Sequence, residues 1–240
     1  MRLTGRNAIV TGAGSGIGRA SAVLFAKEGA FVALVDRDRA GLQERLTAIE
    51  GDKGEASVHA GDVSEADFAQ TVVSDVMARR GRLDVLTAAA GFSCGGTVLT
   101  TDPADWDAVF RTNVGGTWLW SRAAVPEMQR RGGGSIITLA SQLAIAGGKG
   151  NSAYIAAKGA IGQLTYGTGT APVNGAANTG TQVGNYAITG ATASTGYPFA
   201  ISAIVSGLTP RTADWFDTNL AALTGGTASV QNLTCSALEL

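Results

Sequence analysis

The 240-residue chain has little cysteine, almost no net charge and no long apolar run, and each absence argues against a class of protein. Cys94 and Cys235 are too few for a disulfide framework, so a reducing cytoplasm is the expected location. A net charge of -1 gives no reason to expect nucleic acid or an anionic membrane as a partner. No apolar run approaches the roughly 20 residues of a membrane span, and residues 1–3 lead directly to the first strand-like run. Neither a membrane segment nor a signal peptide is therefore expected.

Histidine, the commonest metal ligand, is also scarce. The single histidine, His59, lies inside a strand-like run over residues 56–60, with no cysteine or acid at metal-ligand spacing. It is interpreted as a structural residue. No metal site is predicted.

Glycine is abundant instead, with 34 residues, and the most informative lie in residues 11–18, TGAGSGIG. This turn follows the apolar run 8–10 and precedes a helical pattern over 19–28. Gly12 permits a tight turn, Gly16 lets backbone approach a ligand because it lacks a Cβ, and Gly18 permits close helix–strand packing. The helix start offers free N–H groups and a positive dipole end to a pyrophosphate. The turn predicts a dinucleotide site formed by Thr11, Gly12, Gly14, Ser15, Gly16, Ile17 and Gly18.

An acid follows the second apolar run. Residues 31–35 are continuously apolar, as in a parallel strand buried on both faces, and the run ends at Asp36. A carboxylate about 20 residues after the glycine turn can accept hydrogen bonds from an adenosine ribose, and it would repel a 2′-phosphate. NAD is therefore favoured over NADP. Arg37, also a candidate cofactor-binding residue, and Arg39 leave NADP open because either could reach a phosphate.

Strand-like and helix-like runs alternate as far as about residue 164. Helices are expected over 39–50, from Ser64 or Glu65 to 79 with Ser64 as N-cap, over 103–128 and over 151–164; strands are expected over 56–60, 83–86 and 135–139. This alternation predicts an α/β fold with a doubly wound parallel sheet. Ligands bind beyond the carboxyl ends of the strands in such a sheet, and Ser141 lies just beyond one of them.

Tyr154 and Lys158 are four residues apart, so on a helix they share a face with about 6 Å of rise between them. A free tyrosine, with a pKa of about 10, is a poor acid–base catalyst at neutral pH. A nearby ammonium stabilises the phenolate and lowers that pKa. Such a pair alone is more often a solvated helix face. Together with Ser141 and a nucleotide turn in the same sheet, it indicates catalysis.

Residues 3 to about 164 resemble the short-chain dehydrogenase/reductase family, which implies a Rossmann-like fold. The resemblance rests on residues 11–18, Asp62-Val63, Asn113, Ser141 and the segment 154–158, YIAAK. It implies reversible hydride transfer between a nicotinamide cofactor and a small-molecule secondary alcohol or ketone.

The resemblance also implies a role for each matching residue. Tyr154 would be the proton donor or acceptor, Ser141 would hydrogen-bond the substrate oxygen, and Lys158 would bind the nicotinamide ribose. Asn113 would hold a water in a proton relay. The adenine would meet Asp62 and Val63, and the remaining implied cofactor contacts are Ala89 and Gly91.

The chain departs from the family at Ala88-Ala89-Ala90-Gly91, where the family carries an asparagine after the fourth strand. That asparagine would brace neighbouring strands. Its loss is expected to cost about 1–3 kcal/mol of stability if a buried partner is left unsatisfied.

Residues 166–240 change character: they contain no lysine and are dominated by threonine, glycine, alanine, serine and asparagine. Short β-prone runs with turn signals between them occupy 183–193, 199–208, 215–223 and 227–240. They predict a β-rich segment in place of the family's last two strands, with domains over 1–165 and 166–240. In composition and rhythm the segment loosely resembles β-modules of phage tail fibres; the alternative is a segment that does not fold.

The sequence leaves more than one function open. The first is an NAD-dependent oxidoreductase. The second is a catalytically impaired nucleotide-binding protein whose tail serves assembly, and the third is a chimera joined near residue 165. We expect the tail to cover the edge of the fifth strand, which otherwise stays open to aggregation. A homo-oligomer is also left open, since the family commonly pairs through the helices that carry Asn113 and Tyr154.

Overall fold

The computed structural model describes residues 1–162, 164 and 237–239. The strands are β1 (Asn7–Thr11), β2 (Phe31–Asp36), β3 (Glu55–Ala60), β4 (Val85–Ala88), β5 (Ser135–Thr138) and β6 (Ala237–Glu239). The helices are α1 (Gly16–Lys27), α2 (Arg39–Gly51), α3 (Ala66–Arg80), α4 (Pro103–Phe110), the π-helix η1 (Arg111–Gly116), α5 (Thr117–Arg130), α6 (Leu143–Ala146) and α7 (Ser152–Gly162). The predicted alternation of strands and helices is confirmed.

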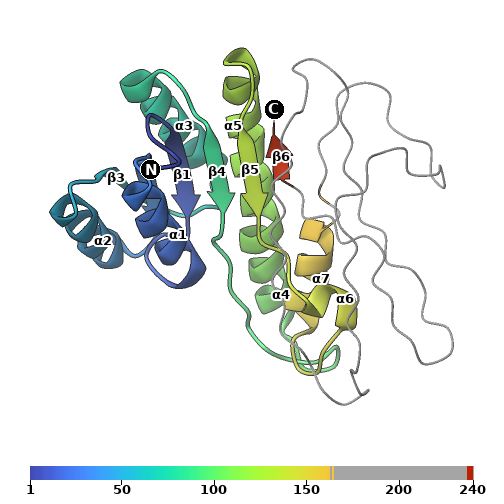
Figure 1. Ribbon diagram of the computed structural model, residues 1–240. Helices are drawn as coiled ribbons and strands as arrows, with labels where there is room; N and C mark the ends of the chain where they lie inside the picture. The colour runs from blue at the N-terminus through green and yellow to red at the C-terminus, as the bar shows by residue number, and fades with distance from the viewer. Residues whose placement is uncertain (163, 165–236, 240) are drawn as a thin grey trace, which may run out of the picture.

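The strands form one sheet in the order β3-β2-β1-β4-β5-β6, and β1 to β5 are parallel (Figure 1). The chain winds outward from β1 in one direction and from β4 in the other, so the predicted doubly wound, Rossmann-like sheet is confirmed. Thr11 pairs with Val35 on one side and Ala88 on the other, which brings the carboxyl ends of three strands together. The crevice at this switch point is where such sheets bind ligands.

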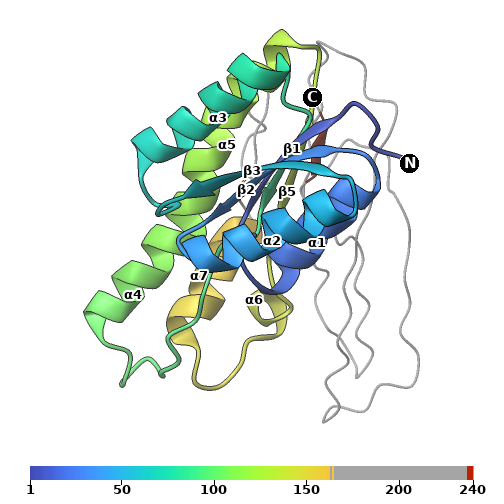
Figure 2. The same ribbon diagram turned by 90° about the vertical axis from the view of Figure 1, so that its left-hand side faces the viewer.

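Helices cover both faces of the sheet, with α1 and α2 on one side and α3 and α5 on the other (Figure 2). Alternate strand residues pack toward opposite faces: Val10 belongs to the core under α1 and α2, and Ile9 to the core under α3 and α5. Both faces of β1 and β2 are therefore buried, which explains their continuous apolar runs.

The far end of the chain adds an antiparallel strand to this sheet. β6 pairs with β5, with Ile136 opposite Leu238. It lies on the strand edge that the tail was expected to cover. The predicted runs over 183–193, 199–208 and 215–223, the boundary at 165 and the phage-fibre likeness lie outside the described residues.

Two local predictions are wrong. The helix expected over 103–128 is not one regular α-helix, because η1 interrupts it. Within η1, the Asn113 side chain makes hydrogen bonds to the backbone of Phe92 in the loop after β4. Ser64 is not the N-cap of α3. Its hydroxyl donates instead to Asp62 Oδ1 at 2.7 Å, and the helix begins after Glu65.

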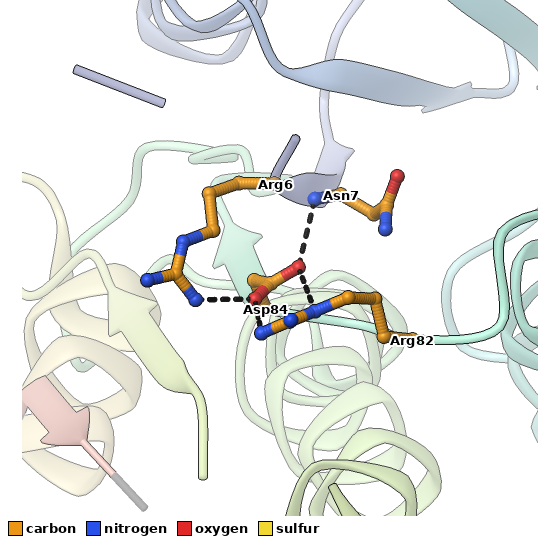
Figure 3. Close-up of polar contacts among 4 residues, drawn as sticks. All are labelled: Arg6, Asn7, Arg82 and Asp84. Atoms are coloured by element: carbon orange, nitrogen blue, oxygen red, sulfur yellow. Dashed lines mark hydrogen bonds and ion pairs between the residues drawn. The ribbon is translucent and has the colours of Figure 1, made fainter. Parts of the chain in front are cut away.

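Asp84 links the amino ends of β1 and β4, at the end of the sheet opposite the glycine turn. Figure 3 shows its contacts. Its buried carboxylate accepts hydrogen bonds from Arg6 Nη1 at 2.8 Å, the Asn7 backbone at 2.9 Å and Arg82 Nε at 3.0 Å. The charge is thus fully partnered, as burial requires. This contact holds the two strands that flank the switch point in register.

Candidate active site

The turn after β1 is shaped by its glycines. Gly12 has φ +69°, and a Cβ there would lie 2.9 Å from the backbone nitrogen of Ala90. A Cβ on Gly18 would lie 2.2 Å from the carbonyl oxygen of Gly12, so only glycine lets α1 pack this closely on the turn. The tight turn and the close packing predicted for these two residues are both observed.

The start of α1 is open. Gly16 has φ +53°, and apart from its chain neighbours and the backbone of its own helix no described atom lies within 4 Å of the place where its Cβ would be. The N-cap Ser15 makes no side-chain cap hydrogen bond, and the first turn of the helix holds no acid. The helix N–H groups and the positive dipole end therefore face space that an anion can fill. These features fit a pyrophosphate.

Asp36, the last residue of β2, is fixed against this turn. Its Oδ2 accepts from the backbone of Gly14 at 3.1 Å, and its Oδ1 accepts from the backbone of Asp38 at 3.0 Å. Each carboxylate oxygen has a second lone pair for a further donor. The side chain is thus oriented beside the glycine turn, where the sequence predicts a ribose.

The loop after β4 is held against β1 without the family's asparagine. Thr11 Oγ1 accepts from the backbone of Ala89 at 3.1 Å and of Ala90 at 3.2 Å. One residue before Ala88, the buried hydroxyl of Thr87 has no hydrogen-bond partner among the described residues. Thr11 therefore does the bracing, and a buried polar group is nevertheless left unpaired.

Asp62 and Val63 lie in the turn after β3. The backbone and then the hydroxyl of Ser64 donate to Asp62, which lowers the pKa of that carboxyl, and the charges of Arg111 and Arg37 lower it further. Trp120 Nε1 donates to the carbonyl of Val63 at 3.1 Å and so fixes the turn against α5. An ionised carboxylate therefore lies at the predicted adenine position.

Tyr154 and Lys158 lie on one face of α7, as predicted. Lys158 Nζ is 5.5 Å from the centroid of the Tyr154 ring and donates to the carbonyl of Leu139, directly after β5, at 2.6 Å. Lys158 is only 6% exposed, and this burial lowers its pKa from 10.5 to about 8. The structure thus places a buried ammonium beside the phenol at the end of the sheet.

Ser141 follows two residues after Leu139 and precedes α6, a short helix that the sequence did not predict. Its hydroxyl accepts from the backbone of Leu143 at 3.2 Å. A Cβ on Gly148 would lie 3.0 Å from Leu143 and 3.7 Å from Ile155, so α6 and its following loop pack closely on α7. Ser141 is thereby held on the side of the sheet end where α7 lies.

Asn113 is fully buried in η1 and binds the loop after β4. Its Oδ1 accepts from the backbone N–H of Phe92 at 3.0 Å, and its Nδ2 donates to the carbonyl of Phe92 at 3.0 Å. Its own carbonyl accepts from the hydroxyl of Thr117 at 2.7 Å. Sequence reasoning missed this contact with Phe92, because a loop residue that binds through its backbone leaves no side-chain signal.

The rest of the described chain shows no competing site. No group of three metal-ligating side chains occurs in it, and none of its helices is long and apolar enough to cross a membrane. His59 is partly buried, and its Nε2 lies 2.8 Å from Ser57 Oγ and 3.7 Å from Asp75 Oδ2. It lies on β3 against Asp75 of α3, with β2 between it and β1.

Comparison with known proteins points in one direction. A family model described as short chain dehydrogenase matches residues 6–171. A 3-oxoacyl-(acyl-carrier-protein) reductase of Thermotoga maritima is 36% identical over 165 residues, which cover 69% of this chain and 67% of the relative. D-threitol dehydrogenase of Mycolicibacterium smegmatis is 37% identical over 162 residues, covering 67% and 62%. A crystal structure from Burkholderia xenovorans, assigned to the short-chain dehydrogenases/reductases, matches with a TM-score of 0.65 and 35% identity, covering 68% of this chain and 67% of the other.

The matches share one limit. The chain spans about two thirds of the length of the curated relatives it matches. The similarity therefore concerns the sheet, the glycine turn and the helix with Tyr154, rather than the whole of any relative.

Proposed function

Because the chain belongs to the short-chain dehydrogenase family, we propose that it is an oxidoreductase that transfers hydride between NAD(H) and a secondary alcohol or ketone. The observation that carries the proposal is the buried ammonium of Lys158 beside the ring of Tyr154, at 5.5 Å from its centroid. This pair lies at the end of the sheet that also holds the open glycine turn. The scarcity of cysteine supports a cytoplasmic location.

The open turn fits a dinucleotide. A bound nicotinamide supplies the hydride acceptor or donor, which no side chain can do. The start of α1 at Gly16 would hold the pyrophosphate, and Asp36 would accept hydrogen bonds from the adenosine ribose. Asp62 and Val63 would meet the adenine, while Ala89 and Gly91 would lie along the cofactor.

The proton would move at the Tyr154 oxygen. In reduction the phenol donates its proton to the carbonyl oxygen of the substrate, and in oxidation the phenolate accepts it. Lys158, with a pKa of about 8, is mostly charged at neutral pH and would stabilise the phenolate. Ser141 would hydrogen-bond the substrate oxygen, and Asn113 would hold a water in a proton relay toward Lys158.

The preference for NAD rests on Asp36. Its carboxylate would repel a 2′-phosphate. The positive charge of Arg37 acts on Asp62 in the neighbouring turn, where it lowers the pKa of that carboxyl. Calorimetric titration should show tighter binding of NADH than of NADPH, and Asp36→Ala should reduce that difference. Equal binding of both cofactors by the natural chain would contradict the preference.

A second candidate is a nucleotide-binding protein with impaired catalysis. The pairing of β6 favours it, since an antiparallel strand occupies the edge of β5 where the family continues its sheet. An assay of turnover over a panel of secondary alcohols with NAD and of ketones with NADH distinguishes the two candidate functions. Turnover of any member supports the oxidoreductase, and NADH binding without turnover across the panel supports the second candidate.

A further inference from the structure

The loop from Phe92 to Thr101, between β4 and α4, is hydrogen-bonded to the first turn of α7. The backbone N–H of Ser152 donates to the carbonyl of Gly96 at 3.0 Å, and the hydroxyl oxygens of Thr101 and Ser152 are 2.7 Å apart. A helix start has N–H groups without partners inside the helix. In α7 the loop therefore supplies such a partner.

The hydroxyls of Thr101 and Ser152 have distinct roles as donor and acceptor. Each hydroxyl carries one hydrogen. Thr101 donates its hydrogen to the carbonyl of Thr97 at 2.7 Å, so Ser152 must donate to Thr101. Among the described residues, the other acceptor within reach of the Ser152 hydroxyl is the carbonyl of Gly96, which is farther away at 3.4 Å. Thr101 is thus the acceptor that holds the Ser152 side chain.

The loop is itself fixed. At its start, Asn113 binds both backbone groups of Phe92. In its middle, Gly96 has φ +87°, and a Cβ there would lie 2.6 Å from the Thr101 hydroxyl oxygen at the end of the loop. Between them, Cys94 packs against the same small apolar cluster as Ala153 of α7. A shift of the helix start would have to break these contacts.

We propose that Thr101 is a positioning residue, which acts through Ser152 to set the place of Tyr154 for proton transfer. This inference rests on the proposed function. Tyr154 lies two residues after Ser152 and one turn before Lys158, whose ammonium binds the carbonyl of Leu139. The tyrosine is held between an anchor on the loop and an anchor on the end of β5. Proton transfer needs its oxygen within hydrogen-bond reach of the substrate, so release of either anchor lowers its rate.

The test compares Thr101→Val, which keeps the shape and removes the hydroxyl, with Thr101→Ser, which keeps the hydroxyl. Thr71→Val is the matched control, because the exposed Thr71 hydroxyl makes a similar 2.7 Å bond, to Asp67 on α3. We expect kcat to fall about 10-fold to 100-fold in Thr101→Val, since a small misplacement of a reacting group has effects of this size. The KM for NADH should stay unchanged, and Thr101→Ser and Thr71→Val should keep the natural kcat.

Amide exchange at Ser152 is measured on the same proteins, so that the two proposals can fail separately. Faster exchange at Ser152 in Thr101→Val, with the lowered kcat, supports the inference. An unchanged kcat in an active protein overturns it, and so does an equal loss in Thr101→Ser. If the natural chain turns over no substrate, the proposed function fails; unchanged exchange at Ser152 would then overturn the anchor, and faster exchange would support it.

Discussion

Lys158 carries its charge in a place where charge is costly, and that cost should be measurable. Its folded pKa is about 8, below the ordinary 10.5, because it is buried. Between these values the unfolded state binds the proton and the folded state does not, so this lysine lowers stability below pH 8 and ceases to do so as the pH rises toward 10.5. Relative to Lys158→Met, the natural chain should gain about 3 kcal/mol of unfolding free energy across this range.

Urea unfolding of the two proteins at a series of pH values checks this difference. The comparison cancels the titration of groups remote from Lys158 and the pH-independent loss of the bond to Leu139. The methionine variant should also lose turnover, because it keeps the shape of the site without the charge. If the unfolding free energies of the two proteins changed with pH in parallel, folding would not lower the pKa of Lys158, which would contradict this prediction.

His59 should make the unfolding free energy depend on pH below about 6.5. Burial lowers its pKa below 6.5, Arg79 acts in the same direction, and Asp75 opposes both. As the pH falls below 6.5 the unfolded state takes up a proton before the folded state does, so stability is lost. His59→Gln should flatten the unfolding free energy between pH 5 and 7. Because the chain has a single histidine, an unchanged slope in the variant would exclude this residue as the cause.

The sequence predicted the candidate site residues better than it predicted the hydrogen-bond partners that hold them in place. Asp36 and the Tyr154–Lys158 pair follow from carboxylate and phenol chemistry at the ends of strands and on one helix face. The partners of Ser64 and Asn113 could not be predicted, because each depends on a tertiary contact. Ser64 serves Asp62 instead of a helix end, and Asn113 binds the backbone of Phe92.

At the scale of elements, the packing of α1 on the glycine turn gives a sharp test. A Cβ at Gly18 would lie 2.2 Å from the Gly12 carbonyl oxygen, whereas a Cβ at Gly51, the last residue of α2, would have no described atom within 4 Å outside its own helix and chain neighbours. Gly18→Ala should therefore lower the unfolding free energy by about 1–3 kcal/mol and weaken NADH binding.

Gly51→Ala is the control for this change. It should be neutral or stabilise by up to about 1 kcal/mol, because alanine restricts the unfolded chain. Chemical unfolding and NADH titration of both variants provide the comparison. Similar effects of the two substitutions would mean that close packing of α1 is not what requires glycine at position 18.

Elements with strong apolar patterns were predictable, and those made by contacts were not. β1 and β2 are buried on both faces, so their continuous apolar runs identify them. η1 interrupts a helical pattern that is otherwise regular, and α6 is only four residues long. Neither departure is encoded in local periodicity.

At the scale of the molecule, the alternation of strands and helices predicted a doubly wound sheet. The strand order β3-β2-β1-β4-β5, with β1 and β4 at its centre, agrees with that prediction. The antiparallel direction of β6 could not be predicted, since its sequence carries no direction signal and its partner lies about 100 residues away. The site lies where the two windings meet, which is why residues far apart in the chain converge there.

One measurement tests the central claim most directly: NADH binding and ketone turnover by the natural chain and by Tyr154→Phe. Both proteins should bind NADH with similar affinity, because the cofactor contacts lie mainly at the glycine turn and Asp36. The natural chain should reduce at least one ketone, and Tyr154→Phe should lower kcat about 100-fold or more, because general acid catalysis contributes that much. Equal turnover by the two proteins, or no NADH binding by the natural chain, would contradict the account.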